Sequence, residues 1–288
     1  MAVRQHGQQH RHGKNGVRAL AALAAAGVVA VAAGCSAPGG DMANASADGP
    51  VAEQPAAVLG RAADVLAEAG GAETRTSMET SSGGTRVTIR GQGTYDFRRQ
   101  TGSVKVVLPK DPAGTEKHRP ITELLAPGAL YMMNRGAGVP DGKWVKVETA
   151  GLADGNLVTG GVTDPTAAAE LLRGASGVRE VGATELAGVK VRHYRGTADI
   201  GRAAAAASPL SRDALTAAAK GFSTDAVPFD AYLDEEGRLR KVRHRFRFSA
   251  QGPQVTVVST LLLYGFGMPV EVELPDDADI YTGEIQQG

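Results

Sequence analysis

Changes in the spacing of hydrophobic residues divide the chain into predicted helices and strands. Apolar side chains recur at helical spacing over residues 55–69 and stop at Gly70-Gly71, which predicts an amphipathic helix. The chain then becomes rich in Thr, Val, Ile and aromatic residues punctuated by glycine, which is typical of strands. We expect these first strands over 73–80, 85–97, 102–108, 129–134 and 143–148.

The second half of the chain again combines helices with strands. Asp164-Pro165 is typical of an N-cap followed by proline at the first helical position, so a short helix is predicted over 165–173. The Ala-rich stretch 199–220 contains Ser208-Pro209, which predicts two short helices or one interrupted helix. Further strands are expected over 178–185, 188–197, 227–233, 238–249, 254–264 and 269–274.

The segment 238–249 shows how such a strand would be buried. Side chains alternate between the two faces of a strand, so one face of this segment is apolar and the other basic. The apolar face would carry Val242, His244, Phe246 and Phe248, and the basic face Lys241, Arg243, Arg245 and Arg247. The order of elements predicts an α+β fold, with one wide antiparallel sheet and short helices on one face.

Residues 1–34 have the layout of a secretory signal. The first 18 residues carry four basic side chains and no acidic one, and an uninterrupted run of Ala, Leu, Val and Gly follows over 19–34. This run is short for a membrane span, which needs about twenty residues. We therefore expect residues 1–34 to be a lipoprotein signal peptide that is removed.

The only cysteine, Cys35, follows this apolar run directly. Ala32-Ala33-Gly34-Cys35 resembles a bacterial lipobox, in which small residues precede a cysteine that is acylated and becomes the first residue. Ala32 stands where leucine is most usual. Acylation would also protect a thiol that has no partner, and several acyl chains suffice for stable anchoring. We predict lipidation of Cys35; the alternative is an uncleaved Ala-rich helix that ends in cysteine.

Charge and composition narrow the functional classes. The chain has 31 basic and 31 acidic residues, and loss of the signal would leave 27 and 31, so the mature protein is mildly acidic. This balance argues against a nucleic-acid binder, and a single cysteine excludes an intramolecular disulfide and argues against a Cys-based zinc site. Small polar residues over 35–54 predict a flexible tether. Residues 55–288 are expected to form a single domain outside the cytoplasmic membrane, as a monomer.

No spacing typical of catalysis or metal binding occurs. His118, His193 and His244 lie far apart in the sequence, and no nucleophile elbow or phosphate-binding loop is present. The acidic residues over 276–279 lack the regular spacing of a calcium loop. We expect no enzyme, no metal and no cofactor. An active site would require His193 and His244 to converge on a carboxylate.

Two features have more than one interpretation. Arg243, Arg245 and Arg247 could face lipid headgroups or an acidic partner, or form the solvent face of a strand beside the acidic residues over 234–236. Ala-rich helices fill a concavity poorly, so the apolar sheet face could enclose an acyl ligand, or tighter helix docking could close an ordinary core. The candidate cavity-lining residues are Val242, Phe246, Phe248, Leu261 and Leu263.

Several short strings in a fixed order resemble a known family. They include the strand Trp144–Val147, Asp164-Pro165 with Leu171-Leu172, Val181-Gly182, Leu186–Val189, His193-Tyr194, the hairpin Leu233–Leu239, Tyr264-Gly265 and Pro275. With the lipobox, they resemble actinobacterial secreted lipoproteins of the LolA-like superfamily, related to the mycobacterial LppX/LprG-type lipoproteins. The resemblance implies a half-barrel sheet with helices on its concave face, often enclosing a lipid-sized cavity. It implies no catalytic residues.

These observations lead to a functional hypothesis with one alternative. We expect a membrane-anchored lipoprotein on the outer face of the cytoplasmic membrane that binds an acylated lipid or other amphiphile in an apolar cavity, for transport or presentation. The alternative is a protein-binding sensor or envelope-assembly lipoprotein that uses the same fold with a filled core. The sequence identifies neither the ligand nor a protein partner.

Overall fold

A computed structural model of the chain describes residues 53–109, 119–222, 224–248 and 255–283. The chain divides into two units, Met1–Pro50 and Val51–Gly288, and every described element belongs to the second unit. The predicted signal peptide, Cys35 and nearly all of the tether lie outside the described residues. Within the part that is described, no helix is both long and apolar enough to cross a bilayer.

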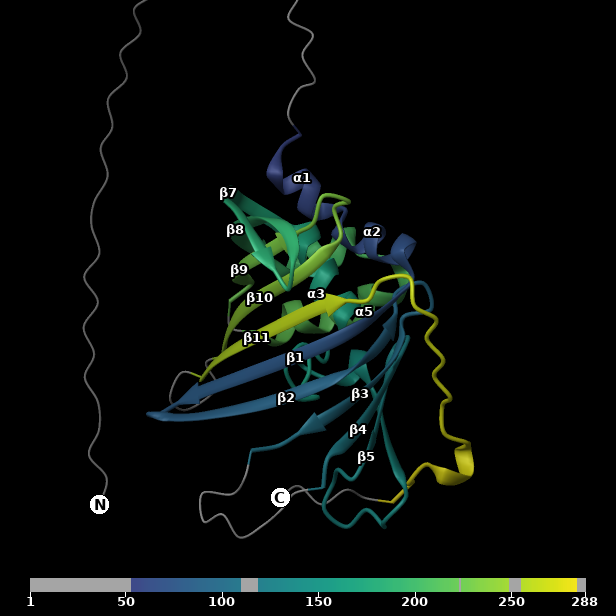
Figure 1. The fold of residues 1–288 in the computed structure, drawn as a ribbon. Helices are drawn as coiled ribbons and strands as arrows, with labels where there is room; N and C mark the ends of the chain where they lie inside the picture. Colours follow the sequence, from purple (N-terminus) through teal and green to yellow (C-terminus); the bar gives the residue numbers. More distant parts are fainter. Residues whose placement is uncertain (1–52, 110–118, 223, 249–254, 284–288) are drawn as a thin grey trace, which may run out of the picture. The chain divides into compact units, whose positions relative to one another are not determined.

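A wide antiparallel sheet of eleven strands organises the second unit (Figure 1). The strand order is β6-β5-β4-β3-β2-β1-β11-β10-β9-β8-β7, so the first and last strands pair in the middle of the sheet. The strands are β1 (Gly71–Ser82), β2 (Thr85–Asp96), β3 (Thr101–Val107), β4 (Ile121–Ala126), β5 (Ala129–Met133), β6 (Trp144–Glu148), β7 (Ala175–Leu186), β8 (Val189–Asp199), β9 (Ala226–Leu233), β10 (Leu239–Phe248) and β11 (Val255–Tyr264).

Short helices lie on one side of this sheet, which confirms the predicted α+β half-barrel with helices on its concave face (Figure 1). The helix predicted over 55–69 is divided at Arg61, and Ser208-Pro209 separates two helices. The helices are α1 (Pro55–Gly60), α2 (Ala62–Ala69), α3 (Pro165–Glu170), α4 (Ile200–Ala206) and α5 (Pro209–Gly221), with single 3₁₀ turns η1 (Thr149–Gly151), η2 (Leu171–Gly174) and η3 (Asp277–Asp279).

One strand was not predicted from the sequence, and one predicted strand is absent. The segment Ile121–Ala126 forms strand β4, although its sequence ITELLA follows a proline-rich stretch and shows no clear alternation. Its burial explains the missing signal, because Glu123, Leu124 and Leu125 are all buried. The expected strand over 269–274 is absent: this segment forms no ladder, and Pro269 has no backbone N–H to donate to one.

The two faces of the sheet have different roles. We call the side covered by the helices the inner face and the opposite side the outer face. One inner row runs across the central strands through Ala231, Val242, Leu261, Thr76, Gly91 and Val106. The apolar members of this row belong to the main buried core, together with Leu59 and Leu66 of the first two helices. The inner face is therefore the packed side of the sheet.

Candidate functional site

A segment without regular secondary structure, residues 152–164, lies between the inner face and helix α5; we call it the inner loop. Gly155 has φ +55°, and a side chain there would collide with the carbonyl oxygen of Ala214 in α5. On the opposite side, Val162 lies over Gly91 of β2, where an added Cβ would come within 2.8 Å of the Val162 side chain. Glycines on both sides thus let the inner loop pack closely between the sheet and the helices.

Side-chain hydrogen bonds hold the shape of the inner loop. The buried carboxylate of Asp154 accepts from the backbone N–H groups of Val158 at 2.8 Å and Thr159 at 2.7 Å. The Asn156 Oδ1 atom accepts from the Gly160 N–H at 3.0 Å. These bonds satisfy backbone donors that no helix or strand serves. The loop is therefore an ordered part of the interior.

The inner loop is attached to the sheet by two further polar contacts. The hydroxyls of Thr163 and Ser259 in β11 lie 2.6 Å apart in a buried hydrogen bond. Arg135, which follows β5, donates to the Gly160 carbonyl oxygen at 2.9 Å. These contacts, with Val162 over the sheet, fix the loop beside the polar residues of the inner face.

Buried polar side chains without hydrogen-bond partners are the most informative feature of this interior. Five side chains carry such atoms within the described part of the chain: Thr74 Oγ1, Thr76 Oγ1, both carboxyl oxygens of Glu123, Asn156 Nδ2 and His244 Nε2. Each has at most 6% exposure. An unsatisfied buried polar group costs roughly 1–3 kcal/mol, so a cluster of them requires an explanation.

Strand register places four of these groups on the inner face. Thr74 and Glu123 lie in one row, linked through Gly93 and Val104. His244 of β10 is five strands away from Glu123 of β4, and Thr76 lies on β1 between them. At about 4.8 Å per strand spacing, the groups span roughly 24 Å of the inner face. This distance is comparable with the length of an amphiphile.

Burial keeps the two titratable members of this group uncharged near neutral pH. It raises the pKa of Glu123 to about 8, although the Arg135 guanidinium, 3.9 Å from its Oε1 atom, acts in the opposite direction. Burial also lowers the pKa of His244 to about 3. The inner face therefore offers neutral donors and acceptors, which suit hydroxyl, ester or amide groups better than a phosphate.

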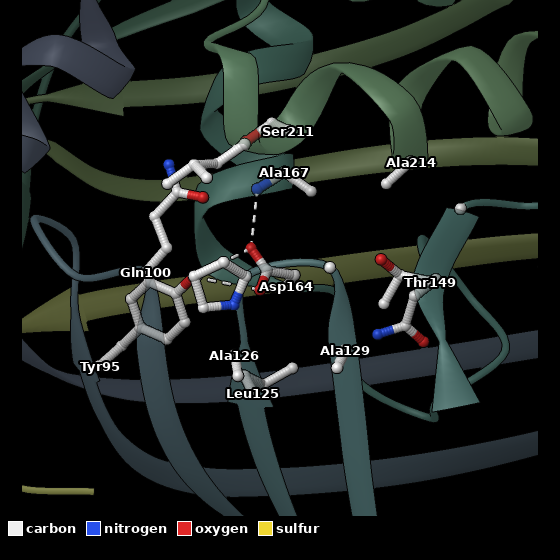
Figure 2. Close-up of a pocket in the computed structure, with 15 residues that line it drawn as sticks. Tyr95, Gln100, Leu125, Ala126, Ala129, Thr149, Asp164, Ala167, Ser211 and Ala214 are labelled. Carbon is white, nitrogen blue, oxygen red and sulfur yellow. Dashed lines mark hydrogen bonds between the residues drawn. The ribbon is translucent and has the colours of Figure 1, made fainter. Parts of the chain in front are cut away.

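A small pocket opens beside the inner loop (Figure 2). Its volume is about 40 Å³, enough for a few water molecules but not for an acyl chain. The lining comes from the sheet, the inner loop and helices α3 and α5, and includes Leu125, Asn156, Asp164, Ala167 and Leu210. Leu210 is 53% exposed, so one wall of the mouth is apolar and accessible.

The pocket contains the contact that closes helix α3 onto the sheet. The Tyr95 hydroxyl of β2 donates to the Asp164 carboxylate at 3.1 Å (Figure 2). It also accepts from the Thr166 hydroxyl at 3.0 Å. Asp164 is also the N-cap of α3, accepting from the Ala167 N–H. Burial raises the pKa of Asp164 and of Tyr95. We call the three-residue contact Tyr95–Asp164–Thr166 the α3 latch.

The residues predicted to line a cavity lie within packed clusters. Val242, Leu261 and Leu263 belong to the main core, and Phe246 belongs to a second cluster formed with the helices. All four are at most 2% exposed, and none lines the pocket of Figure 2. The side chain of Phe248 lies outside the described residues. Their role in ligand binding stays a prediction.

Sequence reasoning missed most of the polar inner residues. Thr74 and Thr76 stand at alternating positions of a predicted strand, which was a usable signal, whereas Glu123 fell in a segment without a predicted strand. The inner loop left no pattern because single side chains, chiefly Asp154, organise it.

The histidines do not converge. His244 lies on the inner face, whereas His193 lies on the outer face, with its Nε2 atom 2.7 Å from Asp230 Oδ1 and its ring stacked on Tyr232. Burial opposes ionisation of Asp230, but hydrogen bonds from His193 and Arg195 hold its pKa below the usual value. Among the described residues, no group of three potential metal ligands occurs. The arrangement required for an active site is therefore not formed by these two histidines.

No known protein family and no curated protein matches the chain. Among solved structures, LprF from Mycobacterium bovis is 11% identical, with 76% of this chain and 96% of that chain covered and a TM-score of 0.41. The Mycobacterium tuberculosis lipoprotein LppX is 11% identical, with coverages of 77% and 100% and a TM-score of 0.41. A LolA-superfamily protein from Nitrosomonas europaea is 10% identical, with coverages of 78% and 96% and a TM-score of 0.31. The structural neighbours thus include the groups that the sequence resemblance named.

Proposed function

We propose that the protein is an extracytoplasmic lipoprotein that is anchored through Cys35 to the outer face of the cytoplasmic membrane. In this proposal it binds an acylated lipid or other amphiphile between the inner face of the sheet and the helices and inner loop that cover it. The observation that carries the proposal is the group of unpartnered polar atoms on Thr74, Thr76, Glu123 and His244. The polar head of a bound amphiphile would give hydrogen-bond partners to those of these atoms that lie beside it. The surrounding apolar core, including Val242 and Leu261, would contact the acyl chain.

The layer that covers the inner face is suited to repacking. Helices α3 and α4 bury mainly alanines against the interior, namely Ala167, Ala168, Ala169, Ala203 and Ala204. Small side chains interlock less deeply than large ones, so a helix that carries them can move with less loss of packing. Ligand uptake would require displacement of the inner loop or of α3, because the pocket of about 40 Å³ is too small for an acyl chain.

The proposal is tested by titrating a fluorescent acyl probe into the polypeptide 36–288. This polypeptide contains the whole compact unit Val51–Gly288, and therefore its complete core, but lacks the cysteine. We expect saturable uptake of one probe per molecule, and displacement by a monoacylglycerol, an acylated lipid with an uncharged head. Absence of uptake would contradict the proposal.

A pair of isosteric variants makes this experiment specific. Thr74→Val together with Thr76→Val removes two unpartnered hydroxyls with little change of shape. We expect this variant to unfold at a higher temperature than the wild type and to bind an amphiphile with a polar head several-fold more weakly. Thr184→Val, at an exposed position of β7, is the control and should change neither property. Unchanged binding in the double variant would contradict a role of these hydroxyls in ligand recognition.

One observation favours the protein-binding alternative. The residues predicted to line the cavity are packed in core clusters, as expected for a sheet with a filled interior. A protein-binding lipoprotein would give no acyl-probe uptake, and crosslinking of the intact lipoprotein in membranes would yield one stoichiometric protein partner. Saturable probe uptake without such a partner would rule against this alternative.

A further inference from the structure

The outer face of the sheet carries an excess of basic residues, although the mature chain as a whole is mildly acidic. In the outer-face rows of strands β1, β2, β3, β8, β9, β10 and β11, nine basic side chains occur with five acidic ones, Glu73, Glu79, Asp96, Asp199 and Asp230. The basic residues are Arg75, Arg86, Arg90, Lys105, Arg195, Lys241, Arg243, Arg245 and Arg247. We call this set the basic outer face.

Strand register arranges these charges as a grid. One row runs Arg195, Asp230, Arg243, Thr260, Ser77, Arg90 across six adjacent strands. The next row contains Lys241, Arg75 and Lys105. The Arg residues singled out in the sequence are thus part of a wider surface, because β10 is a central strand with β9 and β11 on either side. Protection of a sheet edge therefore does not explain them.

Two of the three acidic residues expected to balance the Arg residues of β10, Asp234 and Glu236, bind other arginines. Asp234 accepts from Arg238 and Arg240 at 2.8 and 2.7 Å, and Glu236 accepts from Arg238. On the outer face itself, Asp230 is bound by His193 and Arg195, and Glu79 lies 3.5 Å from Arg86. Within the described part of the chain, no ion pair involves Arg75, Arg90, Lys105, Arg243 or Arg245.

The same face contains a shallow depression that suits an anionic group. Its volume is about 440 Å³, and Arg75, Arg90 and Lys105 line it together with the Gln92 side chain. Thr260 and Ser77 supply hydroxyl groups between Arg243 and Arg90 in the adjoining row. Cationic side chains interspersed with hydroxyl donors are suited to bind phosphate oxygens.

We propose that the basic outer face docks onto anionic lipid headgroups of the membrane to which the protein is anchored. The choice of a membrane over an acidic protein rests on the proposed anchor at Cys35. A tether of about 20 residues has a root-mean-square length of roughly 25 Å, which keeps the sheet close to the bilayer surface. Docking of this face would leave the helices, the inner loop and the pocket mouth on the side away from the membrane.

Vesicle binding of the polypeptide 36–288 tests docking without the lipid anchor, so its result does not depend on acylation or on amphiphile uptake. We expect it to sediment with vesicles of phosphatidylglycerol and phosphatidylcholine at 3:7, to remain in solution with phosphatidylcholine alone, and to be released from the anionic vesicles by 0.5 M NaCl. Equal binding to both vesicle types, binding that resists salt, or no binding to anionic vesicles would each overturn the proposal. The last result would leave an acidic protein as the partner of this face.

A charge-matched pair of variants locates the binding surface. Each basic residue near an anionic surface contributes about fivefold to binding, so Arg243→Ala with Arg245→Ala should weaken vesicle binding about 30-fold. Lys190→Ala with Lys220→Ala removes the same charge from exposed positions outside the basic outer face and should leave binding close to wild type. Equal weakening by the two pairs would show an effect of net charge alone and would overturn docking through this face.

Discussion

At the scale of single residues, Glu123 carries the clearest prediction for stability. Its pKa is about 8 in the folded protein and near 4.5 in the unfolded chain, so the folded state holds the proton more tightly. The contribution of the protonated Glu123 carboxyl group to the free energy of unfolding is fully present below pH 4.5. It amounts to a few kcal/mol and is lost as pH rises through 8. Glu123→Gln should abolish this loss. Urea unfolding at pH 5, 7 and 9 measures it, and exposed Glu235→Gln should behave as wild type.

His244 predicts a pH dependence of opposite sign. Its pKa is about 3 when folded and 6.5 when unfolded, so the unfolded state binds the proton more tightly. Stability from the neutral imidazole is present above pH 6.5 and is lost as pH falls from there towards 3. The free energy of unfolding of His244→Leu minus that of the wild type should therefore be larger at pH 4 than at pH 7. If the difference in unfolding free energy between variant and wild type were the same at pH 4 and pH 7, the burial of a neutral His244 ring would be contradicted.

At the scale of elements, the α3 latch ties the helix layer to the sheet. Tyr95→Phe removes the hydroxyl that bonds Asp164 and Thr166, and should destabilise the protein by about 1–3 kcal/mol because two buried groups lose a partner. It should also speed acyl-probe uptake, since α3 would separate from β2 more readily. Stopped-flow fluorescence measures the rate, with Tyr264→Phe on the outer face as the control. Unchanged stability and uptake would show that the latch does not limit opening.

The elements also show what a sequence can and cannot predict here. The helix beginning at Asp164-Pro165, the break at Ser208-Pro209 and the hairpin of β9 and β10 were predictable, because capping residues, proline and alternation act locally. Strand β4 was not, because its burial removes the alternation. The inner loop and its neighbour Glu123 depend on contacts between distant segments, such as Thr163 with Ser259, which no local pattern encodes.

At the scale of the whole molecule, the anchor is tested through Cys35. Cys35→Ala should release the protein from the membrane fraction or leave it with an uncut signal peptide, because the acylated residue is missing. Fractionation followed by intact-mass measurement distinguishes these results, with Ser46→Ala in the tether as the control. Firm membrane association of a cleaved Cys35→Ala protein would contradict lipidation at this residue.

The central claim is that the space beneath the inner loop and the Ala-rich helices receives an amphiphile. Native mass spectrometry of the polypeptide 36–288, exported behind a cleavable signal peptide that has no lipobox and purified without detergent, tests it most directly. The account predicts a species heavier than the polypeptide by one amphiphile, which is lost on denaturation and reduced in the Thr74→Val and Thr76→Val double variant. A single mass equal to that of the bare polypeptide, unchanged after incubation with a monoacylglycerol, would contradict it.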